Sequence, residues 1–366
     1  MNREVRLFLI SNMYPSKEQP YVGTFIQNIE ESLCPSKIKV VQKALIKGYK
    51  NNKAYRLFQY VSLIINIFWI GLTKKYDTIY LHYLGIHFYP VILLKILRPC
   101  KKLILNTHGT DLLKGKANVN LNKIKQYGII NCDLLVCPSE YFAQLVSFHF
   151  PNLKDRIYIS PSGGVNNDIF FANKVLKYDN DTINIGFASR IVEKKGWRTM
   201  CASIKILADK GYNVKLEMLG DGEDKMKVLD FIQKNKLADR ITLLGGLPHK
   251  ELGNFFRMID LFIFPTLYFE SLGLVALESL SCGTPVIASN RGALTNIIND
   301  KYNGYLFEPN NEIELAETII GHINSSKNDK LKMSQNAIKS SKKYNSKTVG
   351  KELSDKIYEV SRIPKH

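Results

Sequence analysis

The chain has 366 residues, of which 45% are hydrophobic, 11% aromatic and 23% charged. This composition excludes disordered, collagen-like and low-complexity proteins, whose sequences cannot form, or do not need, a packed core. Because a single core rarely grows beyond about 250 to 300 residues, we expect two domains.

Short apolar segments alternate with helical patterns along the whole chain. In the first half, strands are predicted at residues 5–11, 77–83, 102–109, 133–139 and 156–164. After a polar stretch, the second half predicts strands at residues 183–189, 214–220, 240–246, 260–266 and 284–289. Such alternation is typical of parallel βαβ units, so we expect an α/β protein with two doubly wound parallel sheets.

The intervening segments show helical spacing. Helices are predicted at residues 24–33, 196–210 and 224–235, and residues 312–360 read as consecutive polar helices without a strand signal. We therefore expect domains at residues 1–165 and 166–345, and a final helix at residues 346–366 that crosses back to the first domain.

The most apolar stretch, Leu57–Leu72, is 16 residues long and contains Gln59, Ser62 and Asn66. Spanning a bilayer takes about 20 apolar residues, so we expect a helix that is either buried or lies on a membrane surface. The N-terminal residues combine early charges with an apolar run that lacks a small-residue cleavage site. This favours a first strand over a signal peptide and predicts a cytoplasmic protein.

Neither cysteines nor histidines form a recognisable metal motif. The six cysteines contain no C-x-x-C pair, and the seven histidines offer no H-E-x-x-H. We expect buried, reduced thiols and no metal site.

The net charge of +18 is unevenly distributed. Residues 1–180 hold 24 basic and 11 acidic residues, whereas residues 181–366 hold 27 and 22. A basic excess in one half suggests nucleic acid, an acidic lipid surface or a phosphorylated substrate, with a solvated basic surface as the alternative. The chain lacks any motif that reads nucleic acid, so we expect no nucleic-acid partner.

The strongest candidate for chemistry follows the predicted strand at residues 260–266. Glu270 and Glu278 stand eight positions apart in the run ESLGLVALE, and a helix is expected to begin near Gly273. The free N–H groups and partial positive charge of a helix N-terminus can bind a phosphate. Taken alone, two such carboxylates are more often a surface residue and a charge near a helix end.

The run ESLGLVALESLSCGTPVIAS resembles the signature of glycosyltransferase family 4, the retaining, nucleotide-sugar-dependent enzymes of the GT-B fold, whose hallmark is E-x7-E. Similar matches occur at IGFASRIVEKKG (185–196), LGDGED (219–224), HGTD (108–111) and YVGTF (21–25). The resemblance covers essentially the whole chain. It implies two Rossmann-like domains that face each other across a cleft, with the acceptor bound mainly by the first and the donor by the second.

The resemblance also implies roles for residues of the second domain. Arg190 and Lys195 would bind the diphosphate of the donor, with Lys194 as the alternative if the loop register differs. A guanidinium and an ammonium can neutralise a departing diphosphate without a metal. Glu278 would accept hydrogen bonds from the ribose, and Glu270 would lie beside the transferred sugar.

Further expected site residues come from the same matches. Within the signature, Ser271, Leu272, Gly273 and Leu274 would contact the donor, and Leu272 stands where the family commonly has an aromatic residue. Leu247, in the run Gly245-Gly246-Leu247-Pro248, lies where relatives contact the base through main-chain groups, with a plain strand-to-helix turn as the alternative. In the first domain, His108 would lie near the reacting bond. Gly23 would let the backbone approach a phosphate; an ordinary turn or loop role is the alternative for both residues.

These inferences predict a retaining hexosyltransferase that needs no metal or other cofactor. It would transfer a sugar from a nucleotide donor, UDP-linked by expectation, to a hydroxyl of a glycan or lipid-linked acceptor. The expected setting is bacterial capsule, O-antigen or exopolysaccharide synthesis. A nucleotide-sugar epimerase and a catalytically silent accessory subunit are the alternatives. The basic first domain and Leu57–Leu72 with Lys74 and Lys75 suggest peripheral binding to an anionic membrane, at the inner face of the cytoplasmic membrane.

Overall fold

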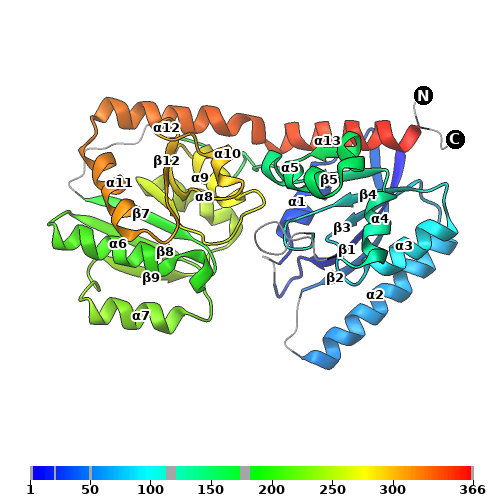
Figure 1. The fold of residues 1–366 in the computed structure, drawn as a ribbon, viewed down its shortest axis with the longest axis horizontal. Coiled ribbons are helices and arrows are strands. Elements are labelled where there is room, and N and C mark those ends of the chain that lie inside the picture. The colour runs from blue at the N-terminus through cyan, green and yellow to red at the C-terminus, as the bar shows by residue number, and fades with distance from the viewer. Residues whose placement is uncertain (1–2, 20–21, 49–51, 113–120, 174–181, 364–366) are drawn as a thin grey trace. The chain divides into compact units, whose positions relative to one another are not determined.

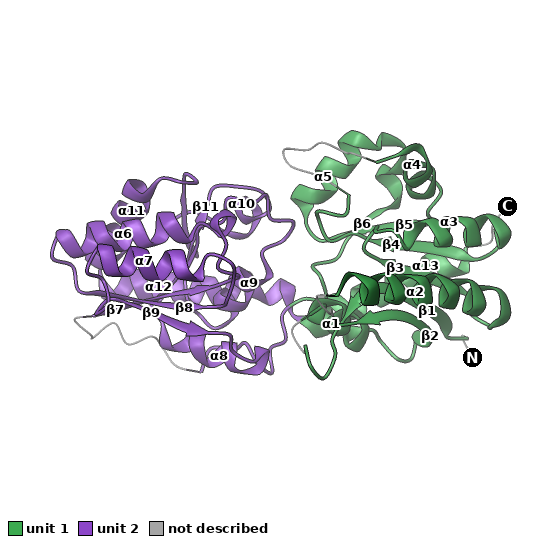
Figure 2. Cartoon of the chain, turned by 90° about the horizontal axis from the view of Figure 1, so that it is seen from below, with its two compact units in different colours: residues 1–164, 346–366 green, residues 165–345 purple. Residues whose placement is uncertain are grey.

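The computed structural model describes residues 3–19, 22–48, 52–112, 121–173 and 182–363. The chain divides into two compact units, coloured separately in Figure 2. Unit 1 comprises residues 1–164 and 346–366, and unit 2 comprises residues 165–345.

Unit 1 is built on a parallel sheet of six strands in the order β2-β1-β3-β4-β5-β6 (Figure 1). The strands are β1 (Val5–Tyr14), β2 (Ile38–Lys47), β3 (Thr78–His82), β4 (Lys102–Asn106), β5 (Leu134–Cys137) and β6 (Ile157–Ile159). Alternate residues of β1 enter different apolar clusters: Phe8 and Ile10 pack on one side, and Leu7 and Leu9 on the other. The sheet is therefore buried on both faces, as parallel sheets are.

Helices cover both faces of this sheet. One face carries α2 (Lys53–Thr73), α3 (Phe88–Leu97), α4 (Lys123–Ile130) and α5 (Glu140–His149), followed by the short helix η1 (Pro151–Arg156). The other face carries α1 (Thr24–Ser32) and the C-terminal helix α13 (Ser346–Arg362). In α13, Leu353, Ile357 and Val360 enter the same apolar cluster as Ile29 of α1, so the C-terminal segment completes the core of unit 1.

Unit 2 repeats this architecture with a sheet in the order β12-β11-β10-β7-β8-β9. The strands are β7 (Ile183–Ala188), β8 (Val214–Leu219), β9 (Ile241–Gly245), β10 (Leu261–Phe264), β11 (Val286–Ser289) and β12 (Gly304–Phe307). One apolar cluster joins this sheet to α6 (Trp197–Asp209), α7 (Lys225–Lys234) and α11 (Glu312–Asn324). The opposite cluster joins it to α8 (His249–Met258), α9 (Leu274–Ser281), α10 (Leu294–Ile297) and α12 (Lys327–Ser341). Two short helices complete this unit, η2 (Glu193–Lys195) and η3 (Lys342–Tyr344).

The predicted α/β fold of two doubly wound parallel sheets is confirmed. Two strands were not predicted, β2 and β12, and both lie at a sheet edge. In β2, Lys39 and Lys43 interrupt the apolar pattern, and β12 has only four residues beside Asn303. Edge strands face water along one side, so their sequences carry a weaker apolar signal than central strands.

The apolar helix is longer than the stretch that the sequence marked, and the expectation for the cysteines is wrong in part. The helix around Leu57–Leu72 extends over Lys53–Thr73, and only Leu63, Ile67 and Gly71 of it are buried. In the described part of the chain, it is the one helix whose length and composition would allow it to cross a membrane. All six cysteines are free thiols, but Cys100 is exposed and Cys34 is half-buried. The expected burial therefore holds for the other four cysteines only.

Candidate active site

The order of the strands in unit 2 marks where a ligand should bind. Strands β7, β8 and β9 follow one another toward one edge, whereas β10, β11 and β12 run toward the other, so the order reverses between β7 and β10. In open parallel sheets, ligands bind outside the carboxyl ends of the strands at such a reversal. The loops after β7 and β10 carry Arg190, Lys195 and Glu270, three of the predicted site residues.

Lys195 and Glu270 form an ion pair at this point. The Lys195 Nζ lies 2.6 Å from Glu270 Oε1, and both side chains are largely shielded from solvent. The hydroxyl of Thr266 donates a second hydrogen bond to the same oxygen, at 3.1 Å. The ammonium also lies 5.4 Å from the ring centre of Tyr268. The loops after β7 and β10 are thus joined through charged groups that a diphosphate and a sugar hydroxyl could contact.

Arg190 and Lys194 differ from Lys195 in their surroundings. Arg190 is exposed, and within the described residues its guanidinium forms no hydrogen bond or ion pair. Lys194 is exposed as well, and its ammonium lies 5.5 Å from the ring centre of Tyr268. The geometry therefore favours Lys195 over Lys194 as the inner cation and leaves the Arg190 guanidinium available to a ligand.

Glycines hold the loop after β7 in place. Gly196 has φ +77°, and a Cβ there would lie 1.8 Å from the carbonyl oxygen of Pro265 at the end of β10. Gly220, with φ +127°, would bring a Cβ within 1.9 Å of the Ser189 carbonyl oxygen. A Cβ on Gly222 would lie 2.3 Å from the Ile191 carbonyl oxygen. The run LGDGED thus packs backbone to backbone against the cationic loop, and this close contact requires glycine at both positions.

The N-terminus of α9 lies in the signature segment, where the sequence predicted it. Gly273 is the N-cap residue with φ +90°, and no side chain caps the helix. The side chain of Leu272 is only 4% exposed and packs in the core of unit 2, so a donor could contact this residue only through its main chain. Ser271 and Leu274 are half-buried beside it. The first N–H groups of α9 are the part of this segment suited to a phosphate.

The backbone of Glu270 is fixed by the loop after β11. The Ala293 N–H donates to the Glu270 carbonyl oxygen at 3.0 Å. Arg291 donates to the Leu267 carbonyl oxygen at 2.7 Å, and its guanidinium stacks on Phe269. Sequence reasoning missed these supporting residues, because nothing in their local pattern distinguishes them from an ordinary loop.

Glu278 is buried in α9, where its carboxylate contacts a histidine that the sequence analysis did not single out. Its Oε1 lies 3.1 Å from His249 Nε2, at the first residue of α8. Burial raises the pKa of the Glu278 carboxyl, and the contact with His249 opposes that rise. The hydrogen bond to Glu278 raises the pKa of His249. A ribose that binds Glu278 must therefore bond to the other carboxylate oxygen of Glu278 or displace His249. The sequence could have indicated His249 by its position directly after Gly245-Gly246-Leu247-Pro248.

The segment before His249 presents an open main chain. A Cβ on Gly245 or Gly246 would meet no atom within 4 Å, and Leu247 is 38% exposed. This edge is accessible to a flat ligand such as a nucleobase. The base and phosphate candidates thus lie on loops at the carboxyl ends of β7, β9 and β10, and the ribose candidate Glu278 lies in α9, the helix that follows β10.

In unit 1, the predicted residue His108 follows β4 and contacts a second histidine. Its Nε2 lies 3.2 Å from Nδ1 of His82, which ends β3, and its ring packs against Phe25 of α1. Desolvation lowers the pKa of His108 to about 3, so the imidazole is neutral near pH 7. Asp111 accepts hydrogen bonds from the backbone N–H groups of His108 and Leu84, so the HGTD loop is tied to the segment after β3.

Gly23, the other predicted residue of unit 1, caps α1 with φ +71°. A Cβ there would lie 2.9 Å from backbone atoms of Met13 and Tyr14, at the end of β1. This close approach explains the glycine without a ligand. Its proposed contact with a phosphate remains a prediction.

Among the described residues, no group of three or more histidine, cysteine, aspartate or glutamate side chains is placed to hold a metal ion. The positive charge at this site comes from Arg190, Lys195 and the N-terminus of α9.

A pH-dependent contribution to stability is expected from His249. A raised pKa means that the His249 contact stabilises the fold fully below the ordinary histidine pKa of about 6.5, and less as the pH rises through the folded value. His249→Gln should lower the free energy of unfolding by about 1 kcal/mol at pH 6 and by less at pH 9. Thermal unfolding of both proteins over a pH series measures this difference. A difference that stays constant with pH would contradict the assignment.

The two units, each a Rossmann-like parallel sheet, define the GT-B fold, the architecture of a large class of glycosyltransferases. Residues 168–340 match the model of the family described as glycosyl transferases group 1. This match lies within unit 2, which holds the Lys195–Glu270 pair.

Curated relatives agree with this class. An uncharacterised glycosyltransferase of Methanocaldococcus jannaschii is 29% identical over 340 residues, which cover 87% of this chain and 90% of the relative. A D-inositol 3-phosphate glycosyltransferase of Paenarthrobacter aurescens is 34% identical over 48% of this chain and 45% of its own length. The capsular polysaccharide glycosyltransferase CapM of Staphylococcus aureus is 31% identical over 41% and 39%. The match thus spans less than half of the last two relatives.

Solved structures show the same fold at low identity. HepE of Anabaena in complex with UDP superposes with a TM-score of 0.75 at 15% identity, covering 97% of this chain and all of that one. Sucrose-phosphate synthase of Thermosynechococcus elongatus gives 0.75 at 16% identity, with coverage of 97% and 98%. Together, the family match, the relatives and the fold support a glycosyltransferase.

Proposed function

We propose that this protein is a retaining, family 4 glycosyltransferase that moves a hexose from a UDP-sugar to a hydroxyl of a glycan or lipid-linked acceptor. The observation that carries the proposal is the Lys195–Glu270 pair at the strand reversal of unit 2, beside the exposed Arg190 and the free N-terminus of α9. The cations and the helix N-terminus suit the diphosphate of a nucleotide-sugar, and the Glu270 carboxylate suits a hydroxyl of its sugar.

In the proposed mechanism, Arg190, Lys195 and the first N–H groups of α9 stabilise the charge that builds on the diphosphate as the bond from the anomeric carbon to the phosphate oxygen breaks. The acceptor oxygen forms the new bond on the same face of the sugar, and its proton passes to the departing phosphate oxygen. Glu270 accepts a hydrogen bond from the sugar, and Glu278 accepts one from the ribose. His108, being neutral, serves by orienting hydroxyl groups rather than by supplying charge.

The choice of UDP and of a surface polysaccharide draws on the relatives. HepE has been solved with UDP and with UDP-glucose, and CapM is named for capsular polysaccharide biosynthesis. The open main chain at Gly245–Gly246 is compatible with reading the edge of a uracil.

The test is to incubate the protein with a UDP-sugar and to measure free UDP with and without a candidate glycan acceptor. Acceptor-dependent release of UDP, with an unchanged anomeric configuration in the product by NMR, supports a retaining transferase. Conversion of the sugar without release of UDP would indicate the epimerase, and binding without any turnover would indicate the silent subunit.

Transfer should persist in excess chelator. Two cationic side chains and a helix N-terminus supply the charge that a divalent ion otherwise gives to a leaving diphosphate. Initial rates with EDTA are expected to equal those with added Mg²⁺, after pre-incubation long enough to strip a bound ion. Rates that collapse in EDTA and recover with Mg²⁺ would contradict the metal-free mechanism.

A further inference from the structure

Helix α2 is apolar on two sides, and only one of them is packed. Leu63, Ile67 and Gly71 lie one turn apart and are buried against the rest of unit 1. At Gly71 the helix approaches α3 so closely that a Cβ would lie 2.3 Å from a methyl carbon of Leu94. The inner side of α2 is therefore part of the core.

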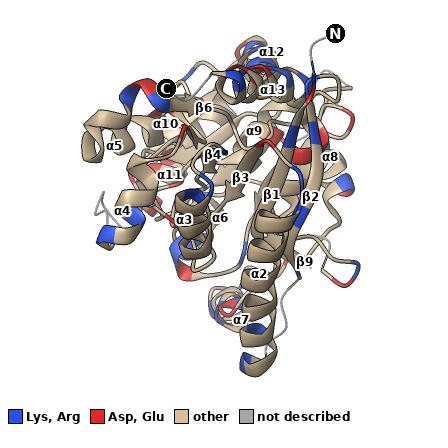
Figure 3. Ribbon diagram, turned by 90° about the vertical axis from the view of Figure 1, so that its right-hand side faces the viewer, with Lys and Arg blue, Asp and Glu red and all other residues tan. Residues whose placement is uncertain are grey.

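The outer side of α2 carries large apolar side chains in water. Leu57 and Phe58 are 67% and 66% exposed, and Ile65 and Trp69 are each 61% exposed. From Leu57 to Thr73 this helix has no charged residue, so its ribbon is tan along most of its length in Figure 3. A helix that is apolar all round is normally buried, either in a protein core or in lipid. No described part of the chain buries this outer side.

The exposed apolar surface continues onto α3, which packs beside α2. Leu93, Ile96 and Leu97 of α3 are about half exposed. We call these three residues together with Leu57, Phe58, Ile65 and Trp69 the apolar face of unit 1. An isolated exposed leucine is ordinary, but seven large exposed apolar side chains on two neighbouring helices mark an interaction surface.

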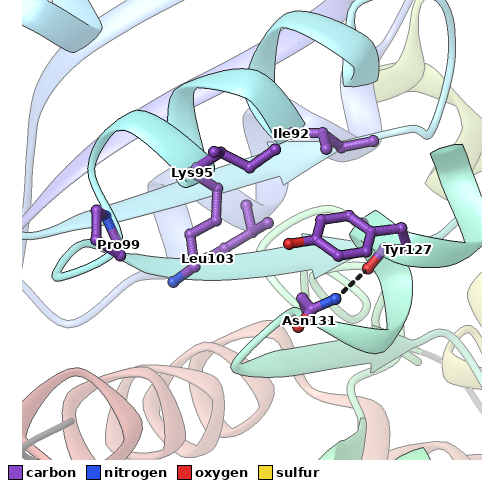
Figure 4. A pocket seen from close by; sticks show the side chains of 8 residues that line it. Ile92, Lys95, Pro99, Leu103, Tyr127 and Asn131 are labelled. Carbon is purple, nitrogen blue, oxygen red and sulfur yellow. Dashed lines mark hydrogen bonds between the residues drawn. The ribbon is translucent and has the colours of Figure 1, made fainter.

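A pocket of about 260 Å³ lies between α3 and α4, at the border of this face (Figure 4). Ile96 and Tyr127 stand among its lining residues, and Lys95 extends through it. The Lys95 ammonium is 2.8 Å from the Asp133 carboxylate and is bonded to a backbone carbonyl, so its charge is already used within unit 1. An anionic partner of the apolar face must therefore be attracted by other cations.

Such cations are abundant around α2. Residues 32–110 contain 13 lysines and arginines and a single acidic residue, Asp77. Asp77 is held by Arg6, with 2.8 Å between Arg6 Nη2 and its Oδ1. Lys53 and Arg56 lie in the first turn of α2, and Lys74 and Lys75 follow its last residue, all of them exposed. Cations thus stand at both ends of the apolar outer side.

Exposed apolar side chains with cations at both ends of the helix favour one kind of partner over the others that could cover the face. A second copy of the chain would bring two strongly basic surfaces together, and their repulsion opposes pairing. Crossing a bilayer would require α2 to withdraw Leu63 and Ile67 from the core of unit 1. A helix with Trp, Phe and Leu on one side and cations at its ends has the composition of helices that lie in the bilayer interface.

We infer that the apolar face of unit 1 docks on a bilayer that contains anionic lipids. Helix α2, about 30 Å long, lies in the plane of the interface with Leu57, Phe58, Ile65 and Trp69 among the acyl chains. Lys53, Lys74 and Lys75 contact lipid phosphates at its two ends. The inference does not rest on the proposed transferase activity, and its test needs no sugar donor.

The chain offers a direct probe of this contact. It has two tryptophans, and Trp197 is only 1% exposed, so only the emission of Trp69 should respond to a new environment. Adding vesicles of phosphatidylcholine and phosphatidylglycerol to the full chain should shift the emission to shorter wavelength. Pure phosphatidylcholine vesicles should give a much smaller shift, and added salt should weaken the effect. Trp69→Phe should abolish the shift while the protein still co-sediments with the vesicles.

Variants separate the apolar and the charged contributions. The double variant Ile65→Ser/Trp69→Ser should reduce vesicle partitioning by roughly tenfold or more, because two large side chains no longer enter the lipid. Lys74→Ser/Lys75→Ser should reduce it by roughly tenfold at low salt and by less at high salt. The matched control, Met258→Ser/Ile313→Ser, removes two exposed apolar residues of unit 2 and should leave partitioning unchanged.

All the replaced side chains are exposed, so thermal unfolding should remain close to that of the unmodified protein. Vesicle binding that is absent, insensitive to salt or unaffected by Ile65→Ser/Trp69→Ser would overturn the inference. So would a stable dimer in the absence of lipid that the same double variant converts to monomer, because the face would then serve self-association.

Discussion

Replacing Lys195 by Met should lower the turnover number by about 100-fold, the loss expected when one positioned group that stabilises developing charge is removed. The Lys195 ammonium is fixed against Glu270 at 2.6 Å, so it is held in place before the donor arrives. Arg190→Ala should have an effect of similar size, through the same leaving group. Steady-state kinetics with a UDP-sugar and an acceptor measure both effects.

Lys194→Ala is the matched control, since Lys194 is the neighbouring lysine of the same loop and faces the same tyrosine ring from an exposed position. It should retain most of the activity. Full activity in correctly folded Arg190→Ala and Lys195→Met proteins would remove the proposed phosphate site. If only Lys194→Ala lost most of its activity, Lys194 rather than Lys195 would be the lysine that binds the phosphate.

Gly196→Ala should lower the free energy of unfolding by roughly 3 kcal/mol or more. The added Cβ would lie 1.8 Å from the Pro265 carbonyl oxygen in a backbone with φ +77°, so both strain and a clash with main chain oppose the substitution. Because Gly196 directly follows Lys195, any relaxation must move the cationic loop away from β10. Denaturant unfolding measures the loss of stability, and UDP binding should weaken in parallel.

Gly211→Ala provides the control for this effect. Gly211 has φ +82°, nearly the same conformation, but a Cβ there would meet nothing within 4 Å. Only the left-handed strain remains, which costs about 1 to 2 kcal/mol. Equal destabilisation by the two substitutions would show that the contact with Pro265 is unimportant.

The sequence predicted the fold where its signals were strong. Central strands such as β10, whose four residues LFIF are all buried, show an unbroken apolar run between helical segments. The strands β2 and β12 were missed because lysines in β2 and the short length of β12 blur the apolar pattern. Helix α2 shows another limit: its composition could not tell a buried side from an exposed one, since both are apolar.

The candidate site divides in a similar way. Glu270, Glu278, Arg190 and Lys195 stand in runs with local patterns, so they could be selected from the sequence. His249 contacts Glu278, His82 contacts His108, and Arg291 bonds the Leu267 carbonyl near Glu270. Each of the three lies on another element of the fold, at a distance that only the folded structure sets. The sequence also could not predict the roles of Gly196, Gly220 and Gly222. A glycine that packs closely against a backbone carbonyl has the same local sequence pattern as a glycine in a plain turn.

The ion pair between Lys195 and Glu270 has a consequence for selectivity. While the pair is formed, the charge of Lys195 is already neutralised. A small anion such as inorganic phosphate must break the pair, but it supplies no hydrogen-bond donor to replace Lys195 at the Glu270 carboxylate. An intact sugar nucleotide replaces both halves at once, since its phosphate takes the ammonium and a sugar hydroxyl donates to Glu270. After transfer, the nucleoside diphosphate no longer carries that hydroxyl, and Glu270 is free to recover Lys195. We therefore expect this carboxylate to hasten the departure of the spent donor, so that Glu270→Gln retains UDP longer than the unmodified protein does.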